Sequence, residues 1–410
     1  MSIKENTTRN RWLIVLAAGA IMGASLGIRH VQGLFLQPVG LTEGWSRESF
    51  AFALALQNII WGLAQPLAGM LADRFGSVRV ILLGSILYAV GLLLMAASST
   101  SNMMMLTNGI LVGIALSGTA FGAVYGALSK IFDGEHRAWA LAVAGALGGL
   151  GQFLMVPATQ SLIQLMDWRG TAMALGIIML ALAPLAMTLR DTPAKCTYAM
   201  GSLHQAPILI VIKQAFAHSG FWLLTFGFAA CGFQLAFVAT HIPAYLLEHG
   251  LTVRQAGATL AIIALTNILG IYFFARAGGI WPAKKVLSWL YLLRAIAMIL
   301  FISTPVTSWT AYAFSAAMGF LWLGTVPLTN GVLAQIFGVS HIATLFGFAF
   351  LGHQLGGFFG VWLGGLFYDT YGSYDVLWLA SIIIGLLAAC MHWPINDRPL
   401  AERPAMGSAP

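Results

Sequence analysis

Long apolar runs separated by short polar turns dominate this chain of 410 residues. Each run is about 20 residues or longer, the length that an α-helix needs to cross roughly 30 Å of hydrocarbon. Lipid offers the backbone no hydrogen-bond partner, so a spanning run must be helical. The pattern predicts an all-α membrane protein with twelve transmembrane helices at residues 12–36, 49–72, 79–98, 103–129, 138–165, 170–189, 218–247, 256–275, 286–304, 309–335, 342–368 and 375–393.

The longest polar stretch, Arg190 to Lys213, divides these runs into two sets of six. The two sets repeat: Leu128–Phe132, near the end of one run, matches Leu333–Phe337, 205 positions later. Repeated halves in a membrane protein indicate two pseudo-symmetric bundles with a substrate site between them. We predict an N-terminal six-helix bundle, a cytoplasmic linker, and a C-terminal six-helix bundle with a short cytoplasmic tail, at residues 1–189, 190–217 and 218–410.

Composition and charge support this reading. Only 8% of the residues are charged, whereas a soluble domain has about 25%. The chain has 20 lysines and arginines; two lie within apolar runs, and the outer turns hold only Arg47, Arg169 and Arg254. Positive residues favour the cytoplasmic side, so both termini are predicted to be cytoplasmic. The net charge of +7 therefore requires no nucleic-acid partner.

The turn after the second run reads Gly69–Met70–Leu71–Ala72–Asp73–Arg74–Phe75–Gly76–Ser77–Val78–Arg79. This stretch resembles the signature loop of the major facilitator superfamily, and it lies where that family has it. The resemblance implies the twelve-helix fold, with helices 1, 4, 7 and 10 around the central cavity. It also implies a cytoplasmic latch between conformations, in which Gly69 allows close helix approach and Asp73 pairs with a helix end and nearby arginines. The predicted latch residues are Gly69, Asp73, Arg74, Gly76 and Arg79.

Two further stretches resemble the monocarboxylate and oxalate–formate transporter branch. One is Gly44–Trp45–Ser46–Arg47; the other is Gly352–His353–Gln354–Leu355–Gly356, followed by Tyr368–Asp369. The chain departs from that branch in helix 8, where Asn267 is the polar residue and the carboxylate-binding arginine that such carriers often use is missing. In helix 4, Asn108 stands where many proton-coupled members have arginine.

None of the 13 acidic residues falls within the middle of an apolar run, but Arg29 and Arg294 do. An arginine at mid-membrane costs about 2.5–3.5 kcal/mol on insertion scales and needs a partner. With no buried carboxylate in the chain, a transported anion is a suitable partner. Arg29, with Gln32 on the same helical face, is predicted to contact the substrate; alternatively it snorkels outward or pairs with an acidic residue at the helix end.

Arg294 is predicted either to bind the substrate or to play an internal role, bonding to carbonyls of a broken helix near Pro327. Histidine is the side chain suited to carrying a proton at neutral pH, so His241 or His353 is a candidate for coupling. Other polar residues in the runs either orient a carboxylate or only join helices. The predicted substrate-binding set is Arg29, Gln32, Tyr125, Gln152, Gln234, His241, Asn330, Arg294, His353 and Gln354.

These features favour secondary active transport of a small, monocarboxylate-like organic anion across the inner membrane by alternating access. The alternative is a facilitator or exporter of a neutral or hydrophobic small molecule. The runs hold no acid/base or metal cluster for an enzyme, and the chain has no Gly-Lys-Ser/Thr phosphate loop for ATP-driven pumping. We expect no cofactor or metal, a monomer in the bilayer, and either a proton or a counter-anion as the coupled species.

The charge asymmetry gives a direct test of topology. Reporter tags fused after Thr100 or after Thr307 are expected to read as periplasmic, because both turns carry few positive residues. A cytoplasmic reading at either position would contradict the predicted orientation.

Overall fold

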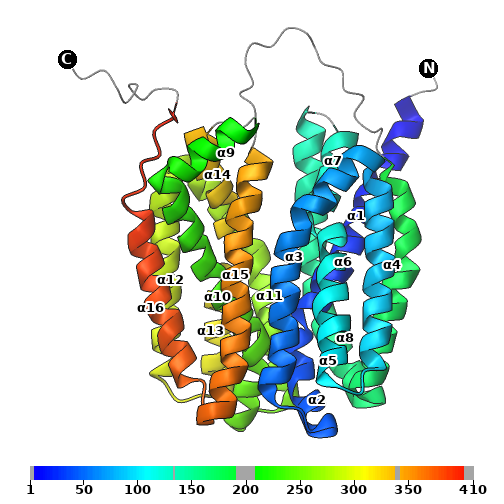
Figure 1. Ribbon diagram of the computed structural model, residues 1–410, viewed down its shortest axis with the longest axis vertical. Helices are drawn as coiled ribbons and strands as arrows, with labels where there is room; N and C mark the ends of the chain where they lie inside the picture. The colour runs from blue at the N-terminus through cyan, green and yellow to red at the C-terminus, as the bar shows by residue number, and fades with distance from the viewer. Residues whose placement is uncertain (1–3, 133, 191–207, 338–341, 401–410) are drawn as a thin grey trace.

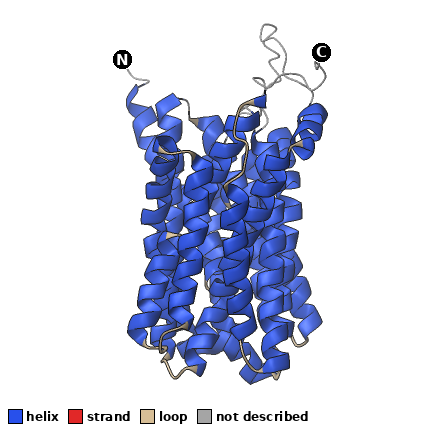
Figure 2. Ribbon diagram, turned by 90° about the vertical axis from the view of Figure 1, so that its left-hand side faces the viewer, coloured by secondary structure: helices blue, strands red, loops and turns tan. Residues whose placement is uncertain are grey.

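The computed structural model describes residues 4–132, 134–190, 208–337 and 342–400, in which every regular element is helical (Figure 2). The helices run along one common direction and form two groups, from blue to green and from green to red (Figure 1). Helix α1 begins and helix α16 ends at the same end of the molecule (Figure 1). We call this the inner end and the opposite one the outer end.

The N-terminal half contains six spanning segments, several of which are built from more than one helix. Its elements are α1 (Lys4–His30), the 3₁₀-helix η1 (Gln32–Phe35), α2 (Leu36–Glu43), α3 (Arg47–Phe75), α4 (Ser77–Ala96), α5 (Ser101–Met104), the π-helix η2 (Met105–Leu111), α6 (Val112–Thr119), α7 (Phe121–Ile131), α8 (Gly134–Leu182) and the 3₁₀-helix η3 (Ala183–Leu189).

The C-terminal half follows a short helix, α9 (Ile208–Ala217), that falls within the predicted linker. Its spanning elements are α10 (Ser219–Glu248), α11 (Val253–Ile280), α12 (Ala283–Ile302), α13 (Ser308–Phe320), α14 (Thr325–Phe337), α15 (Ile342–Tyr371) and α16 (Asp375–His392).

The predicted number of spans is accounted for by a bend inside α8. Among the described residues, eleven helical stretches are long and apolar enough to cross a membrane. One of them contains both the fifth and the sixth predicted spans. Met166 and Asp167, whose backbone angles are non-helical, separate the two spans at a kink. The Asp167 carboxylate accepts a hydrogen bond of 2.9 Å from the Gly170 amide and so caps the segment that follows.

Three predicted spans are not continuous, which corrects the sequence-based ranges. Helix 1 is interrupted at Val31 and continues to Glu43 through η1 and α2. The fourth predicted span is interrupted at Ala120, whose backbone is extended between α6 and α7. The tenth predicted span is interrupted between Phe320, the end of α13, and Thr325, the start of α14. The breaks in the fourth and tenth spans lie at equivalent places in the two halves, and each leaves backbone groups that need hydrogen-bond partners.

The two halves meet along three seams, where α3 packs on α15, α8 on α11, and η1 on α10. The third seam depends on Gly33, since a Cβ atom there would lie 2.4 Å from the carbonyl oxygen of Ala239. Only glycine permits this approach without moving the backbone. Along α3, no residue between Arg47 and Gly62 is exposed, whereas exposed residues recur from Leu63 inward. The halves therefore enclose α3 most completely towards the outer end.

At the outer end, a carboxylate of one half caps a helix of the other. The two oxygens of Asp369 accept hydrogen bonds from the backbone amides of Arg47 and Glu48, at 3.2 and 2.7 Å. These amides belong to the first turn of α3, whose partial positive charge favours an anion. Trp362 donates a further bond of 3.1 Å to the Glu48 carboxylate.

Arg47 adds charged contacts at the same place. Its guanidinium pairs with Glu248, donates to the Tyr374 hydroxyl at 2.8 Å, and lies 3.6 Å from the centre of the Tyr368 ring. Burial raises the pKa of Tyr374 well above its usual value, although Arg47 opposes this. We call Arg47, Glu48, Glu248, Trp362, Tyr368, Asp369 and Tyr374 the outer closure.

Asp369→Asn should weaken the outer closure, because an amide loses the charge that the α3 N-terminus favours. The interaction of a carboxylate charge with a helix N-terminus is worth about 0.3–1 kcal/mol, so the ratio of outward-open to outward-closed molecules should rise about two- to fivefold. Distance measurements between spin labels placed on the two halves at the outer end would detect this change.

Asp375→Asn is the matched control, because Asp375 is exposed and lies at the start of α16 within one half. An unchanged distance distribution in Asp369→Asn would show that this cap does not hold the outer end closed.

Candidate functional site

Arg294 bridges the break between α13 and α14 in the tenth predicted span, and its side chain is 0% exposed. Its guanidinium donates to the carbonyl oxygens of Leu321 and Trp322, the latter at 2.9 Å, and to Gln234 at 3.1 Å. The two carbonyls directly follow the C-terminal end of α13, which carries partial negative charge. A buried cation is thus stabilised without any carboxylate.

Two other side chains complete this arrangement. Asn267 of α11 accepts a bond of 3.1 Å from the Leu323 amide. The Cys231 thiol lies 3.3 Å from the Thr325 hydroxyl, at the start of α14. Gln234 also donates to the Ser381 carbonyl at 2.8 Å. The structure therefore gives both Gln234 and Arg294, predicted as substrate residues, partners inside the C-terminal half; for Arg294 these are the contacts of the predicted internal role.

Arg29 differs because it has a single hydrogen-bond acceptor in the part of the chain described, where Arg294 has three. Its Nη2 donates to Asn58 Oδ1 at 2.7 Å, while its Nε is buried without a partner. Asn58 is 3% exposed, and its own Nδ2 also has no partner. Arg29 and Asn58 thus present two donors that no described group accepts. A buried donor without an acceptor costs about 1–3 kcal/mol.

A third donor lies on the facing helix α15. Gln354 is 2% exposed, and its Nε2 has no hydrogen-bond partner among the described residues. Asn58 and Gln354 both face the α3–α15 seam: a Cβ built at Gly357 would lie 3.4 Å from Asn58 Nδ2, and one built at Gly62 would lie 2.9 Å from Gln354 Cβ. We call Arg29, Asn58 and Gln354 the donor group. Their unsatisfied atoms are those that an anion with several acceptor oxygens complements.

Other predicted residues have internal partners in this conformation. Gln32 accepts from Asn108 Nδ2 at 3.2 Å, and Gln57 donates to Asn108 Oδ1 at 3.1 Å, which joins three segments of the N-terminal half. His241 lies between Val361 O, at 2.8 Å from Nε2, and the Tyr374 hydroxyl, at 3.3 Å from Nδ1. His241 thereby links Tyr374 of the outer closure to the backbone of α15.

The remaining predicted substrate residues lie in segments nearer the inner end. Tyr125 in α7 and Asn330 in α14 follow the equivalent helix breaks, and both are partly exposed. Asn330 donates to Val326 O at 3.2 Å. Gln152 is buried in α8. His353 Nδ1 lies 3.2 Å from Gln354 Oε1 and helps to orient that amide.

Sequence reasoning missed Asn58. The signal was present, because Gln57 and Asn58 are adjacent amides within an apolar run. Neighbouring residues point to different faces of a helix. Gln57 faces its own bundle, and Asn58 faces Arg29 and the second half. Only the packing of α3 shows which of the two belongs to the site.

The predicted latch lies at the inner end of α3. Gly76 has φ of 89°, which favours glycine, and it separates α3 from α4. Arg74 and Arg79 are exposed. The close approach predicted for Gly69 is wrong for this conformation, since a Cβ there would meet nothing within 4 Å. The side chain of Asp73 lies outside the described residues.

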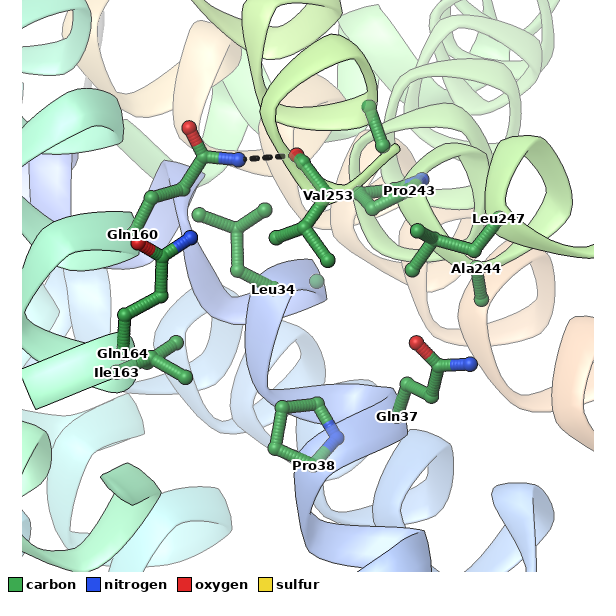
Figure 3. A pocket seen from close by; sticks show the side chains of 12 residues that line it. Leu34, Gln37, Pro38, Gln160, Ile163, Gln164, Pro243, Ala244, Leu247 and Val253 are labelled. Atoms are coloured by element: carbon green, nitrogen blue, oxygen red, sulfur yellow. Dashed lines mark hydrogen bonds between the residues drawn. The ribbon is translucent and has the colours of Figure 1, made fainter. Parts of the chain in front are cut away.

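A separate cavity of about 180 Å³ lies at the outer end of the η1–α10 and α8–α11 seams. Figure 3 shows Gln37, Gln160 and Gln164 around it, with Gln160 donating to Val253 O at 2.5 Å. None of the predicted substrate residues lines this cavity. Across the described residues, no group of three or more His, Cys, Asp or Glu side chains could hold a metal ion.

Comparison with known proteins agrees with this architecture. The family model described as Major Facilitator Superfamily matches residues 10–276 and 247–409. Monocarboxylate transporter 11 of Homo sapiens is 26% identical over 385 residues, which cover 90% of this chain and 79% of that protein. The uncharacterised MFS-type transporter YcxA of Bacillus subtilis (strain 168) is 24% identical, with 97% and 98% covered.

Among solved structures, a bacterial homologue of the human lysosomal transporter Spinster, in an inward-facing and occupied conformation, has the same fold. It superposes with a TM-score of 0.75 at 16% identity, covering 95% of this chain and 98% of that one. Two bundles, equivalent broken helices and a family match along nearly the whole chain lead to one conclusion. This multi-pass membrane protein belongs to the major facilitator superfamily of transporters.

Proposed function

We propose that this transporter carries a small organic anion of the monocarboxylate type across the inner membrane by alternating access. The observation that supports this most directly is the state of Arg29, a cation within the membrane whose described partner is the neutral Asn58. A carboxylate brings the charge and acceptor oxygens that the donor group lacks. The named similarity to monocarboxylate transporters agrees with this substrate class.

The position of the donor group suits a substrate that passes between the halves. Arg29 comes from the N-terminal half, Gln354 comes from the C-terminal half, and both lie near the α3–α15 seam. The outer closure holds this seam shut at one end. An anion that contacts both halves would bind with different strength as the seam opens and closes, which is the condition for coupling binding to a conformational change.

A neutral substrate would leave the charge of Arg29 without compensation. The second arginine does not face this difficulty, because Arg294 already has the carbonyls of α13. We therefore expect substitutions of Arg29 to weaken anion binding and substitutions of Arg294 to reduce the stability of the protein.

Arg29→Lys should weaken carboxylate binding, and Arg29→Gln should weaken it further, because lysine lacks the planar fork of arginine and glutamine lacks its charge. A charged hydrogen bond contributes about 1.5–3 kcal/mol, so affinity should fall roughly ten- to a hundredfold. Calorimetry on purified protein, after a thermal-shift screen of mono- and dicarboxylate salts, would measure this.

Two further substitutions serve as controls. Arg254→Gln, at an exposed outer position, should bind like the wild type. Arg294→Gln should instead reduce yield or thermal stability, since it leaves buried carbonyls without donors. Wild-type affinity in a folded Arg29→Gln protein would refute the anchoring role of Arg29.

A further inference from the structure

One face of α15 carries a row of partly exposed aromatic rings. Phe348, Leu355 and Phe359, which are 36%, 39% and 45% exposed, mark the outward face. Phe346, Phe350 and His353 are spaced four and three residues apart, so they share a face roughly opposite to it. All three are partly exposed.

The rings of this row lie against one another. Phe350 and His353 are stacked, with ring centres 5.7 Å apart and planes 6° apart. Phe346 lies 6.2 Å from Phe350 at 26°. Trp61 of the other half meets Phe350 edge-on at 5.4 Å. We call Trp61, Phe346, Phe350 and His353 the aromatic stripe. It joins rings from both halves of the transporter, and His353 also packs against Phe228 of α10, with ring centres 4.6 Å apart.

The stripe leads to the donor group. The next residue along the same face of α15 is Gly357, beside the Asn58 amide. Since glycine has no side chain, the row of rings ends beside the Asn58 amide. A helix rises about 6 Å over the four residues from His353 to Gly357. A ring on the stripe and a carboxylate at Arg29 and Asn58 would therefore be separated by a short chain of about two carbons.

We propose that the substrate is a carboxylate joined through a short linker to a planar aromatic body. The carboxylate contacts Arg29 and Asn58, and the ring packs against His353 and Phe350. This inference rests on the proposed function and narrows its substrate class. A short aliphatic acid would fill the donor group but leave the stripe uncovered. Stacking between aromatic rings favours an aromatic body over a saturated one of similar size, by about two- to tenfold in affinity.

Four probes separate the contributions of charge, size and aromatic character. They are propionate, 3-cyclohexylpropionate, 3-phenylpropionate and 3-phenylpropionamide, and their affinities for the purified full chain would be measured by calorimetry. We expect 3-phenylpropionate to bind at least tenfold more tightly than propionate and about two- to tenfold more tightly than 3-cyclohexylpropionate. The neutral amide should bind at least tenfold more weakly than the acid.

Substitutions on α15 locate the preference. Phe350→Leu should bring the affinities for 3-phenylpropionate and 3-cyclohexylpropionate to within about twofold of each other, because leucine keeps the apolar surface and removes the ring. Phe359→Leu, on the outward face of the same helix, is the matched control and should keep the wild-type ratio. If Phe350→Leu does not fold, the wild-type probe series still decides the question.

The outcomes distinguish this inference from the proposed function. If propionate bound as tightly as 3-phenylpropionate and Arg29→Gln abolished binding, the aromatic inference would be overturned while anion transport stood. If 3-phenylpropionamide bound as well as the acid, anion selectivity would fail. If none of the probes bound, both the inference and the proposed monocarboxylate class would be contradicted. Equal binding of the phenyl and cyclohexyl acids would also overturn the aromatic preference.

Discussion

A guanidinium within hydrocarbon must find acceptors, and this constraint shapes both halves of the transporter. In the C-terminal half, the acceptors of Arg294 are backbone carbonyls that the break between α13 and α14 leaves without intrahelical partners. The break and the cation stabilise each other: the carbonyls would otherwise lack donors, and the arginine would otherwise lack acceptors. Asn267 completes this exchange from the neighbouring helix by accepting the Leu323 amide.

The N-terminal half does not repeat this solution. The fourth predicted span is broken at the equivalent place, but Arg29 has one described acceptor, Asn58, where Arg294 has three. Together with Gln354, this leaves more donors than acceptors at the seam between the halves. In our proposal this asymmetry serves transport. A bound anion supplies the missing acceptors, and its release leaves the donors unpaired again.

The outer end is closed by interactions of a different kind. The carboxylate of Asp369 caps a helix of the opposite half, and Arg47 pairs with Glu248 beside it. Such contacts lie near water and individually contribute little, so they can break and re-form during a transport cycle. Arg47 and Asp369 come from the two stretches that resemble monocarboxylate transporters, and their meeting gives that resemblance a physical role.

The sequence alone determined the class of protein, the number of spans and the location of its unusual charges. These follow from hydropathy and charge, which are local properties of the chain and need no packing to be read. It also singled out Arg29, Arg294 and Gln354. Packing alone decided their different roles, because the orientation of a helix about its own axis determines which of two adjacent residues faces a neighbour. Asn58 belongs to the site and Gln57 does not for this reason, and Arg294 is internal because a helix broken elsewhere in the chain brings carbonyls to it.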